Sequence, residues 1–158
     1  MSSGTAEIVL IEDNAHDTEL TLYTLGKRNL SQNVEVLRDG AEALDYFFCT
    51  GRFSSRGLQE LPRLVLLDLK LPKVDGMEVL RRVKSDRRLR GTPIVMLTAS
   101  REERDVAESY RLGANSYVVK PVDFDEFAAA LRAVGEYWLE LNEPSPLAES
   151  NGSEEALP

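Results

Sequence analysis

The chain has 158 residues and a formal net charge of −8, from 27 acidic and 19 basic side chains. An acidic protein repels the phosphates of nucleic acids, so we expect no direct nucleic-acid partner. Hydrophobic residues make up 42% of the chain, enough to form one packed domain, but no apolar run approaches the roughly 20 residues that cross a bilayer, so we expect no membrane partner.

Five short apolar runs predict β-strands, at 8–11, 34–37, 64–67, 94–97 and 117–119. The first, third and fourth runs are almost continuously apolar, which is typical of strands buried on both faces of a parallel sheet. Apolar residues at helical spacing recur after each run; in the last such segment they are Phe124, Phe127, Leu131, Val134 and Trp138. The alternation predicts a doubly wound α/β fold with a five-stranded parallel sheet and five helices.

The ends of the chain differ in composition from the middle. We predict an N-terminal extension at 1–5 and a globular domain at 6–141. From Asn142 onward, proline, serine, glycine and glutamate replace the apolar periodicity, so 142–158 are predicted to form a disordered acidic tail. Cys49 is the only cysteine, which excludes an intrachain disulfide and fits a reducing cytoplasm, where we expect the protein to reside.

Polar side chains gather where the predicted strands end. In an open α/β sheet, ligands bind beyond the carboxyl ends of the strands. These ends carry three acids, one hydroxyl and one amine, namely Glu12, Asp13, Asp68, Thr98 and Lys120. Carboxylates held together repel one another unless a cation lies between them or some are protonated. Because hard oxygen ligands of this kind suit Mg²⁺, the set predicts a site for Mg²⁺ or Mn²⁺.

The same residues, with their neighbours, resemble the receiver domains of two-component response regulators. The matching segments are Glu12-Asp13-Asn14, Asp68-Leu69-Lys70-Leu71-Pro72, Asp75-Gly76, Thr98-Ala99 and Tyr117 before Lys120-Pro121. The resemblance covers about 6–140 and implies a flavodoxin-like sheet with strand order 2-1-3-4-5. It also implies a phosphoacceptor signalling protein, not an enzyme with a separate substrate, that a partner histidine kinase phosphorylates.

The resemblance implies how the phosphoryl group and the metal ion are bound. Asp68 would accept the phosphoryl group. Asp13, Asp68 and the backbone carbonyl of Lys70 would bind the metal directly, and Glu12 would reach it through water. With the metal bound, the protein would catalyse its own phosphorylation and dephosphorylation.

The resemblance also implies how phosphorylation changes the molecule. Thr98 would bond a phosphoryl oxygen, and the Lys120 amine would pair with the phosphoryl group. Tyr117 would change rotamer on activation. The peptide bond between Lys120 and Pro121 would be cis, which would fix the direction of the amine.

Three other functions fit parts of the pattern less well. A phosphatase with an aspartate nucleophile needs a second aspartate two positions later as general acid, where this chain has Lys70. A nucleotide-binding fold needs a glycine-rich phosphate loop after the first strand, where Glu12 and Asp13 stand instead. An unphosphorylated binding module on the same fold remains an alternative, which phosphorylation by acetyl phosphate and Mg²⁺ would exclude.

A narrower resemblance is to the regulators that pair with bacterial phytochromes. It rests on Ala43-Leu44-Asp45-Tyr46-Phe47, on the long loop from Thr50 to Pro62 and on Tyr137-Trp138. It implies that the partner kinase is a phytochrome. We expect no DNA-binding output domain, and the output of the protein stays open among a protein contact, a phosphate relay and a phosphate sink.

A second apolar stripe on the last predicted helix indicates self-association. Ala130, Ala133, Tyr137 and Leu141 lie beside the core stripe at the same helical spacing. On the fold of the family, they would adjoin Val106 and Tyr110 of the preceding helix, and receiver domains commonly dimerise through this face. We therefore predict a homodimer, with local packing of Tyr137 and Leu141 against the tail as the alternative.

Overall fold

The computed structural model describes residues 6–27, 33–57 and 61–146. The strands in this part of the chain are β1 (Ile8–Ile11), β2 (Val34–Leu37), β3 (Leu64–Leu67), β4 (Ile94–Thr98) and β5 (Ser116–Val119). The α-helices are α1 (Ala15–Lys27), α2 (Gly40–Phe48), α3 (Gly76–Ser85), α4 (Glu103–Leu112) and α5 (Phe124–Glu136). None of the helices within the described ranges is long and apolar enough to span a membrane.

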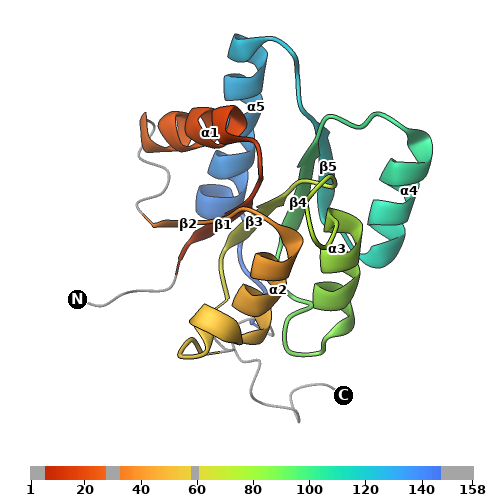
Figure 1. Ribbon diagram of the computed structural model, residues 1–158. Coiled ribbons are helices and arrows are strands. Elements are labelled where there is room, and N and C mark those ends of the chain that lie inside the picture. Colours follow the sequence, from red (N-terminus) through yellow and green to blue (C-terminus); the bar gives the residue numbers. More distant parts are fainter. Residues whose placement is uncertain (1–5, 28–32, 58–60, 147–158) are drawn as a thin grey trace.

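The strands form one parallel sheet in the order β2-β1-β3-β4-β5. Helices α1 and α5 cover one face of the sheet, and α2, α3 and α4 lie on the other side (Figure 1). The predicted doubly wound fold and its strand order are therefore confirmed. This order makes β1 and β3 neighbours, so the residues that follow these two strands meet at the same edge of the sheet.

The central strands are buried on both faces, and each face has its own hydrophobic core. Val9 and Ile11 of β1 belong to the core under α2 and α3, whereas Ile8 and Leu10 belong to the core under α1 and α5. All four side chains are at most 1% exposed. Burying such a side chain stabilises the fold by about 1.5–3 kcal/mol. The apolar strands predicted from the sequence therefore fix the position of the carboxyl ends of the strands, where the polar residues lie.

Three helices begin at an aspartate that caps them. The carboxylates of Asp39, Asp75 and Asp123 each accept a hydrogen bond from the backbone amide three residues later, at 2.7–3.0 Å. Such a cap stabilises a helix by about 0.5–2 kcal/mol. The caps fix the starts of α2, α3 and α5 close to the carboxyl edge of the sheet.

Helix α5 departs from the prediction at both of its ends. Phe127 and Leu131 are buried as predicted, but Phe124, predicted to be in the core, is 54% exposed. Phe124 is the first residue of α5, next to its cap, and lines a surface cleft together with Tyr23. After α5 the chain makes a π-helical turn at Tyr137–Leu141, and of the predicted tail only 142–146 fall within the described residues.

Candidate functional site

The predicted polar residues meet at the carboxyl edge of the sheet. The amide of Asp68, just after β3, donates to the carbonyl of Ile11 at the end of β1, at 3.2 Å. The amide of Lys120, just after β5, donates to the carbonyl of Thr98 at the end of β4, at 2.8 Å. These ladder bonds join residues that are 57 and 22 positions apart in the sequence, so the predicted strand ends meet at one edge of the sheet.

Three acids form a cluster at this edge. Glu12, Asp13 and Asp68 each offer a carboxylate oxygen, and these oxygens lie within 4.8 Å of one another. Glu12 and Asp68 are 2% and 8% exposed, whereas Asp13 is exposed. The cluster fits a hard divalent cation, because it supplies oxygen ligands and leaves one side open for water or phosphate oxygens.

Lys120 is the cationic partner of the acids. Its Nζ donates to Glu12 at 2.7 Å, to Asp17 at 2.9 Å and to Asp68 at 3.1 Å. Asp17 was not predicted from the sequence, although it stands in the first turn of α1, shortly after Glu12 and Asp13. The amine thus joins α1, β1, β3 and β5 at one point.

Burial and charge shift the ionisation of this cluster. Burial raises the pKa of Glu12 to about 7, against the lowering effect of its hydrogen bond with Lys120. Burial alone would lower the pKa of Lys120, but its hydrogen bonds with Glu12 and Asp17 outweigh this, so the pKa lies above its ordinary value. The amine is therefore charged at neutral pH, and a cation bound at the cluster would favour the deprotonated form of Glu12.

The loop between β3 and α3, residues 68–75, starts at Asp68 and is tightly folded. The amide of Lys70 approaches the Asp68 carboxylate at 3.4 Å, while the Lys70 side chain is exposed. The amide of Gly76 donates to the carbonyl of Leu69 at 2.7 Å. A Cβ atom at Gly76 would lie 2.0 Å from the carbonyl oxygen of Asp68, so only glycine permits this close approach of helix and loop.

Thr98 and Tyr117 are connected through Ser100, which was not predicted from the sequence. Thr98 is 1% exposed, and its Oγ1 accepts a weak hydrogen bond from the Ser100 amide at 3.4 Å. The Tyr117 hydroxyl donates to the Ser100 carbonyl at 3.0 Å. The Ser100 hydroxyl donates to Asp105 of α4 at 2.6 Å. A movement at Thr98 would therefore reach both Tyr117 and α4.

The prediction of a cis peptide bond before Pro121 was wrong. Every peptide bond in the described ranges is trans, that of Lys120–Pro121 included. The trans form of an X–Pro bond is favoured by about 0.5–1 kcal/mol. In this form the Lys120 amine already reaches its three carboxylates.

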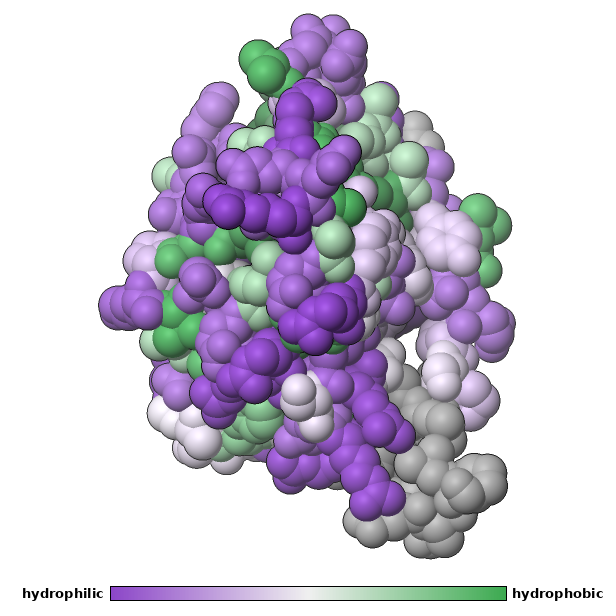
Figure 2. Space-filling view, turned by 90° about the vertical axis from the view of Figure 1, so that its right-hand side faces the viewer, coloured by the Kyte–Doolittle hydropathy of each residue, from purple (hydrophilic) through white to green (hydrophobic). Residues whose placement is uncertain are grey.

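The residues predicted to form a dimer face all have exposed area. Tyr110 of α4 and Tyr137, just after α5, are 49% and 48% exposed. Ala133 is also exposed, and Val106 and Ala130 are half-buried. Figure 2, which faces the side where α4 lies in Figure 1, shows a mostly hydrophilic surface with small separate hydrophobic areas. Neither tyrosine is fully buried, and both self-association and the alternative, packing of Tyr137 and Leu141 against the tail, stay predictions.

Comparison with known proteins identifies the family. The model of the response regulator receiver domain matches residues 8–132. The probable methanogenesis regulatory protein FilR2 of Methanothrix harundinacea is 41% identical over 140 residues, 88% of each chain. Response regulator Rcp1 of Synechocystis is 35% identical over 84% of this chain and 88% of its own.

The solved structures agree with this comparison. The Mn²⁺-bound form of Rcp1 superposes with a TM-score of 0.81 over 87% of this chain and 97% of its own, at 33% identity. The bacteriophytochrome response regulator AtBRR is 54% identical over 86% of this chain and 96% of its own, with a TM-score of 0.66. The chain therefore belongs to the family of response regulator receiver domains, signalling proteins that pair with histidine kinases.

Proposed function

We propose that the chain receives a phosphoryl group on Asp68 from a partner histidine kinase, with Mg²⁺ or Mn²⁺ bound beside it. The observation that carries this proposal is the set of charged groups around Asp68. Its carboxylate is 3.1 Å from the charged Lys120 amine and shares a cluster with Glu12 and Asp13. Asp13, Asp68 and the Lys70 carbonyl would bind the metal directly, and Glu12 through water.

The transfer needs positive charge around a phosphoryl group that is itself negative. An Asp68 oxygen attacks phosphorus, the O–P bond forms as the P–N bond of the donor phosphohistidine breaks, and the imidazole nitrogen keeps the electron pair. When bound, the divalent cation offsets the charge of the carboxylate and of the phosphoryl oxygens. The Lys120 amine adds a second positive charge, and the Thr98 hydroxyl can donate to a phosphoryl oxygen.

The same groups would also remove the phosphoryl group. Water attacks the phosphorus of phospho-Asp68, which releases phosphate and restores the carboxylate. The protein would thus catalyse its own phosphorylation and dephosphorylation, yet it acts on no separate substrate. Phosphorylation instead changes the relative populations of the conformations of the protein.

The conformational change would start at Thr98. If its hydroxyl turns to the phosphoryl group, the weak bond from the Ser100 amide is lost. The loop at Ser100 then shifts, and the Tyr117 hydroxyl loses its carbonyl acceptor and can rotate inward. Because Ser100 also bonds Asp105, α4 would move with the loop.

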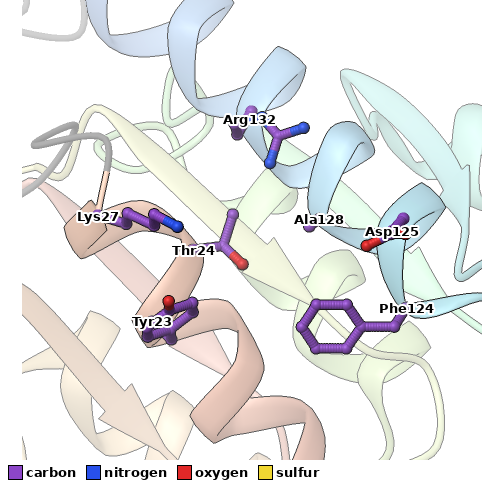
Figure 3. A pocket seen from close by; sticks show the side chains of 7 residues that line it. All are labelled: Tyr23, Thr24, Lys27, Phe124, Asp125, Ala128 and Arg132. Carbon is purple, nitrogen blue, oxygen red and sulfur yellow. The ribbon is translucent and has the colours of Figure 1, made fainter.

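A cleft between α1 and α5 fits the partner kinase. It has a volume of about 430 Å³. It is lined by Tyr23, Thr24 and Lys27 of α1 and by Phe124, Asp125, Ala128 and Arg132 of α5. Figure 3 shows the Tyr23 and Phe124 rings on opposite sides of the cleft. Tyr23 and Phe124 are 60% and 54% exposed, and Val122, two residues after Lys120, is fully exposed.

The position of this cleft supports its assignment to the kinase. A donor histidine must approach Asp68 from the open edge of the sheet, and Lys120 connects Asp68 to Asp17 of α1 at this edge. We propose that the donor helix lies over α1 and the loop before α5. The two aromatic rings offer apolar area, and Lys27 and Arg132 attract an acidic surface. We propose that the kinase helix carrying the histidine presents apolar and acidic side chains here.

The partner kinase would be a bacterial phytochrome, and the active form would be a homodimer. The 54% identity to AtBRR supports the first point. The second rests on the exposed tyrosines Tyr110 and Tyr137. In a symmetric dimer the same surface of both copies is buried, so each exposed ring would gain a partner from the other copy.

Phosphotransfer from a labelled kinase tests the function and its partner together. Wild type should gain label from an autophosphorylated bacteriophytochrome kinase, and the yield should change with red and far-red illumination. The double change Tyr23→Ala and Phe124→Ala should slow this transfer while leaving phosphorylation by acetyl phosphate unchanged, and Tyr110→Ala is the matched control. No transfer to wild type from any histidine kinase would contradict the proposed function, and equal transfer to the double variant would contradict the docking cleft.

A further inference from the structure

The first turn of α2 packs against the loop 68–75. Neither the sequence analysis nor the comparison with the family assigns a role to this turn. Helices α2 and α3 lie side by side on one side of the sheet (Figure 1). The amide of Gly40, the first residue of α2, donates to the carbonyl of Pro72 at 3.2 Å. The amide of Val74 donates to the same oxygen at 2.8 Å, so one carbonyl joins the loop and the helix.

The fit between α2 and the loop leaves no space for a side chain at Gly40. A Cβ atom at this position would lie 1.7 Å from the carbonyl oxygen of Val74 and 2.5 Å from its carbon. Both atoms are backbone, so they could make room only by moving the loop. Since Gly40 has no positive φ, alanine would suit the helix itself, and the damage of Gly40→Ala would fall on the loop.

A second contact fixes the loop at Lys73. The backbone of Lys73 has φ +71°, a conformation that non-glycine residues adopt uncommonly. Its amine forms an ion pair with Asp39 Oδ2 at 3.5 Å. The other oxygen of Asp39 caps α2 by accepting from the Glu42 amide at 2.7 Å. The two oxygens of Asp39 thus link the helix start to the loop.

We propose that Gly40 and Asp39 are positioning residues that hold the loop 68–75, and with it the Lys70 carbonyl, in the conformation that binds the divalent cation. This inference rests on the proposed function, because it assigns a support to the same metal site. Neither residue touches the metal or the phosphoryl group. Outer residues that orient metal ligands typically change metal affinity by about 10–100-fold when they are substituted.

The first test is Mn²⁺ binding by calorimetry to metal-free wild type and to Gly40→Ala. We expect a folded Gly40→Ala variant to bind Mn²⁺ about 10–100-fold more weakly, with faster hydrogen exchange at the amides of Val74 and Gly76. The matched control is Gly26→Ala in α1, where an added Cβ meets nothing within 4 Å, and it should keep the wild-type affinity. A folded Gly40→Ala with wild-type affinity and exchange would overturn the inference.

A second variant decides the matter if Gly40→Ala does not fold. Asp39→Asn keeps a capping oxygen but loses the charge that pairs with Lys73. Because the Lys73 side of the pair is largely exposed, Asp39→Asn should weaken Mn²⁺ binding by at most about fivefold. At about 1 M salt, which screens the ion pair, the variant and the wild type should bind equally well. An Asp39→Asn variant with unchanged affinity at low salt would then overturn the inference.

The wild type separates this inference from the proposed function. A wild type that binds no Mn²⁺ would overturn both. A wild type that binds Mn²⁺ and accepts a phosphoryl group, together with a folded Gly40→Ala that binds equally well, would overturn only the role of α2.

Discussion

Replacing Lys120 by methionine should destabilise the metal-free protein by about 3 kcal/mol or more. The amine is bonded to three carboxylates, and its side chain is only 11% exposed. Methionine keeps the length of the side chain but leaves the carboxylates without their cation. Removing one partner of a buried ion pair typically costs about 3–5 kcal/mol. We expect the lower end near pH 7, because Glu12, whose pKa is about 7, can take up a proton.

The effect of Lys120→Met should grow with pH. In the folded wild type, the pKa of Glu12 is about 7, above its ordinary value of 4.5, so the folded state binds more protons between these pH values. This contribution to stability is present below about pH 4.5 and is lost as pH rises through 7. Without Lys120 the pKa of Glu12 should rise further, so the variant should keep losing stability as pH rises above 7. In the wild type the contribution of Glu12 is already lost there and no longer changes with pH.

Urea unfolding at about pH 6 and about pH 8.5, in EDTA and in Mg²⁺, measures both effects. Mg²⁺ at 100 times its dissociation constant stabilises by about 2.7 kcal/mol. At one Mg²⁺ concentration the gain should be larger in Lys120→Met, where no amine competes for the acids. Lys27→Met, which removes an exposed lysine, should change the free energy of unfolding by less than about 0.5 kcal/mol. A loss below about 1 kcal/mol for Lys120→Met, or a smaller gain from Mg²⁺ than in wild type, would refute the reasoning.

Three further changes test other parts of the account. Asp13→Ala should weaken Mg²⁺ binding and slow phosphorylation because a charged oxygen ligand is lost, and unchanged affinity in a metal titration would contradict this. Gly76→Ala should destabilise the fold by about 1–3 kcal/mol, since a Cβ would lie 2.0 Å from the Asp68 carbonyl; an unchanged urea midpoint would count against the tight loop. Tyr137→Glu should convert a phosphorylated dimer to a monomer without unfolding it. Light scattering of the wild type at high micromolar concentration, with and without a phosphoryl mimic, tests the dimer itself. A wild type that is monomeric in both states would exclude the dimer.

The parts of the fold and site that follow from strand position could be predicted from the sequence. The apolar runs mark the strands, and the residues just after them, such as Glu12 and Asp68, must meet when the strands are parallel neighbours. The strand order itself came from the resemblance to receiver domains. It could not be derived from the apolar pattern, because that pattern does not say which strands pair.

The missed residues depend on contacts between segments that are distant in the sequence. Asp17 bonds Lys120, 103 positions away, and Ser100 accepts from Tyr117, 17 positions away. The wrong core assignment of Phe124 came from periodicity, which shows the face of a helix but not how deeply its first residue is covered. The cis bond expected before Pro121 came from the resemblance alone, and no local sequence signal distinguishes it from the trans bond.

The mass of the intact protein after incubation with acetyl phosphate and Mg²⁺ tests the central claim most directly. Wild type should gain the mass of one phosphoryl group, carried by the peptide that contains Asp68, and should gain none when EDTA removes the metal. Asp68→Asn should gain none under either condition, because the amide has no anionic oxygen to attack phosphorus. An unmodified wild type, or an Asp68→Asn variant modified to the wild-type level, would contradict the account.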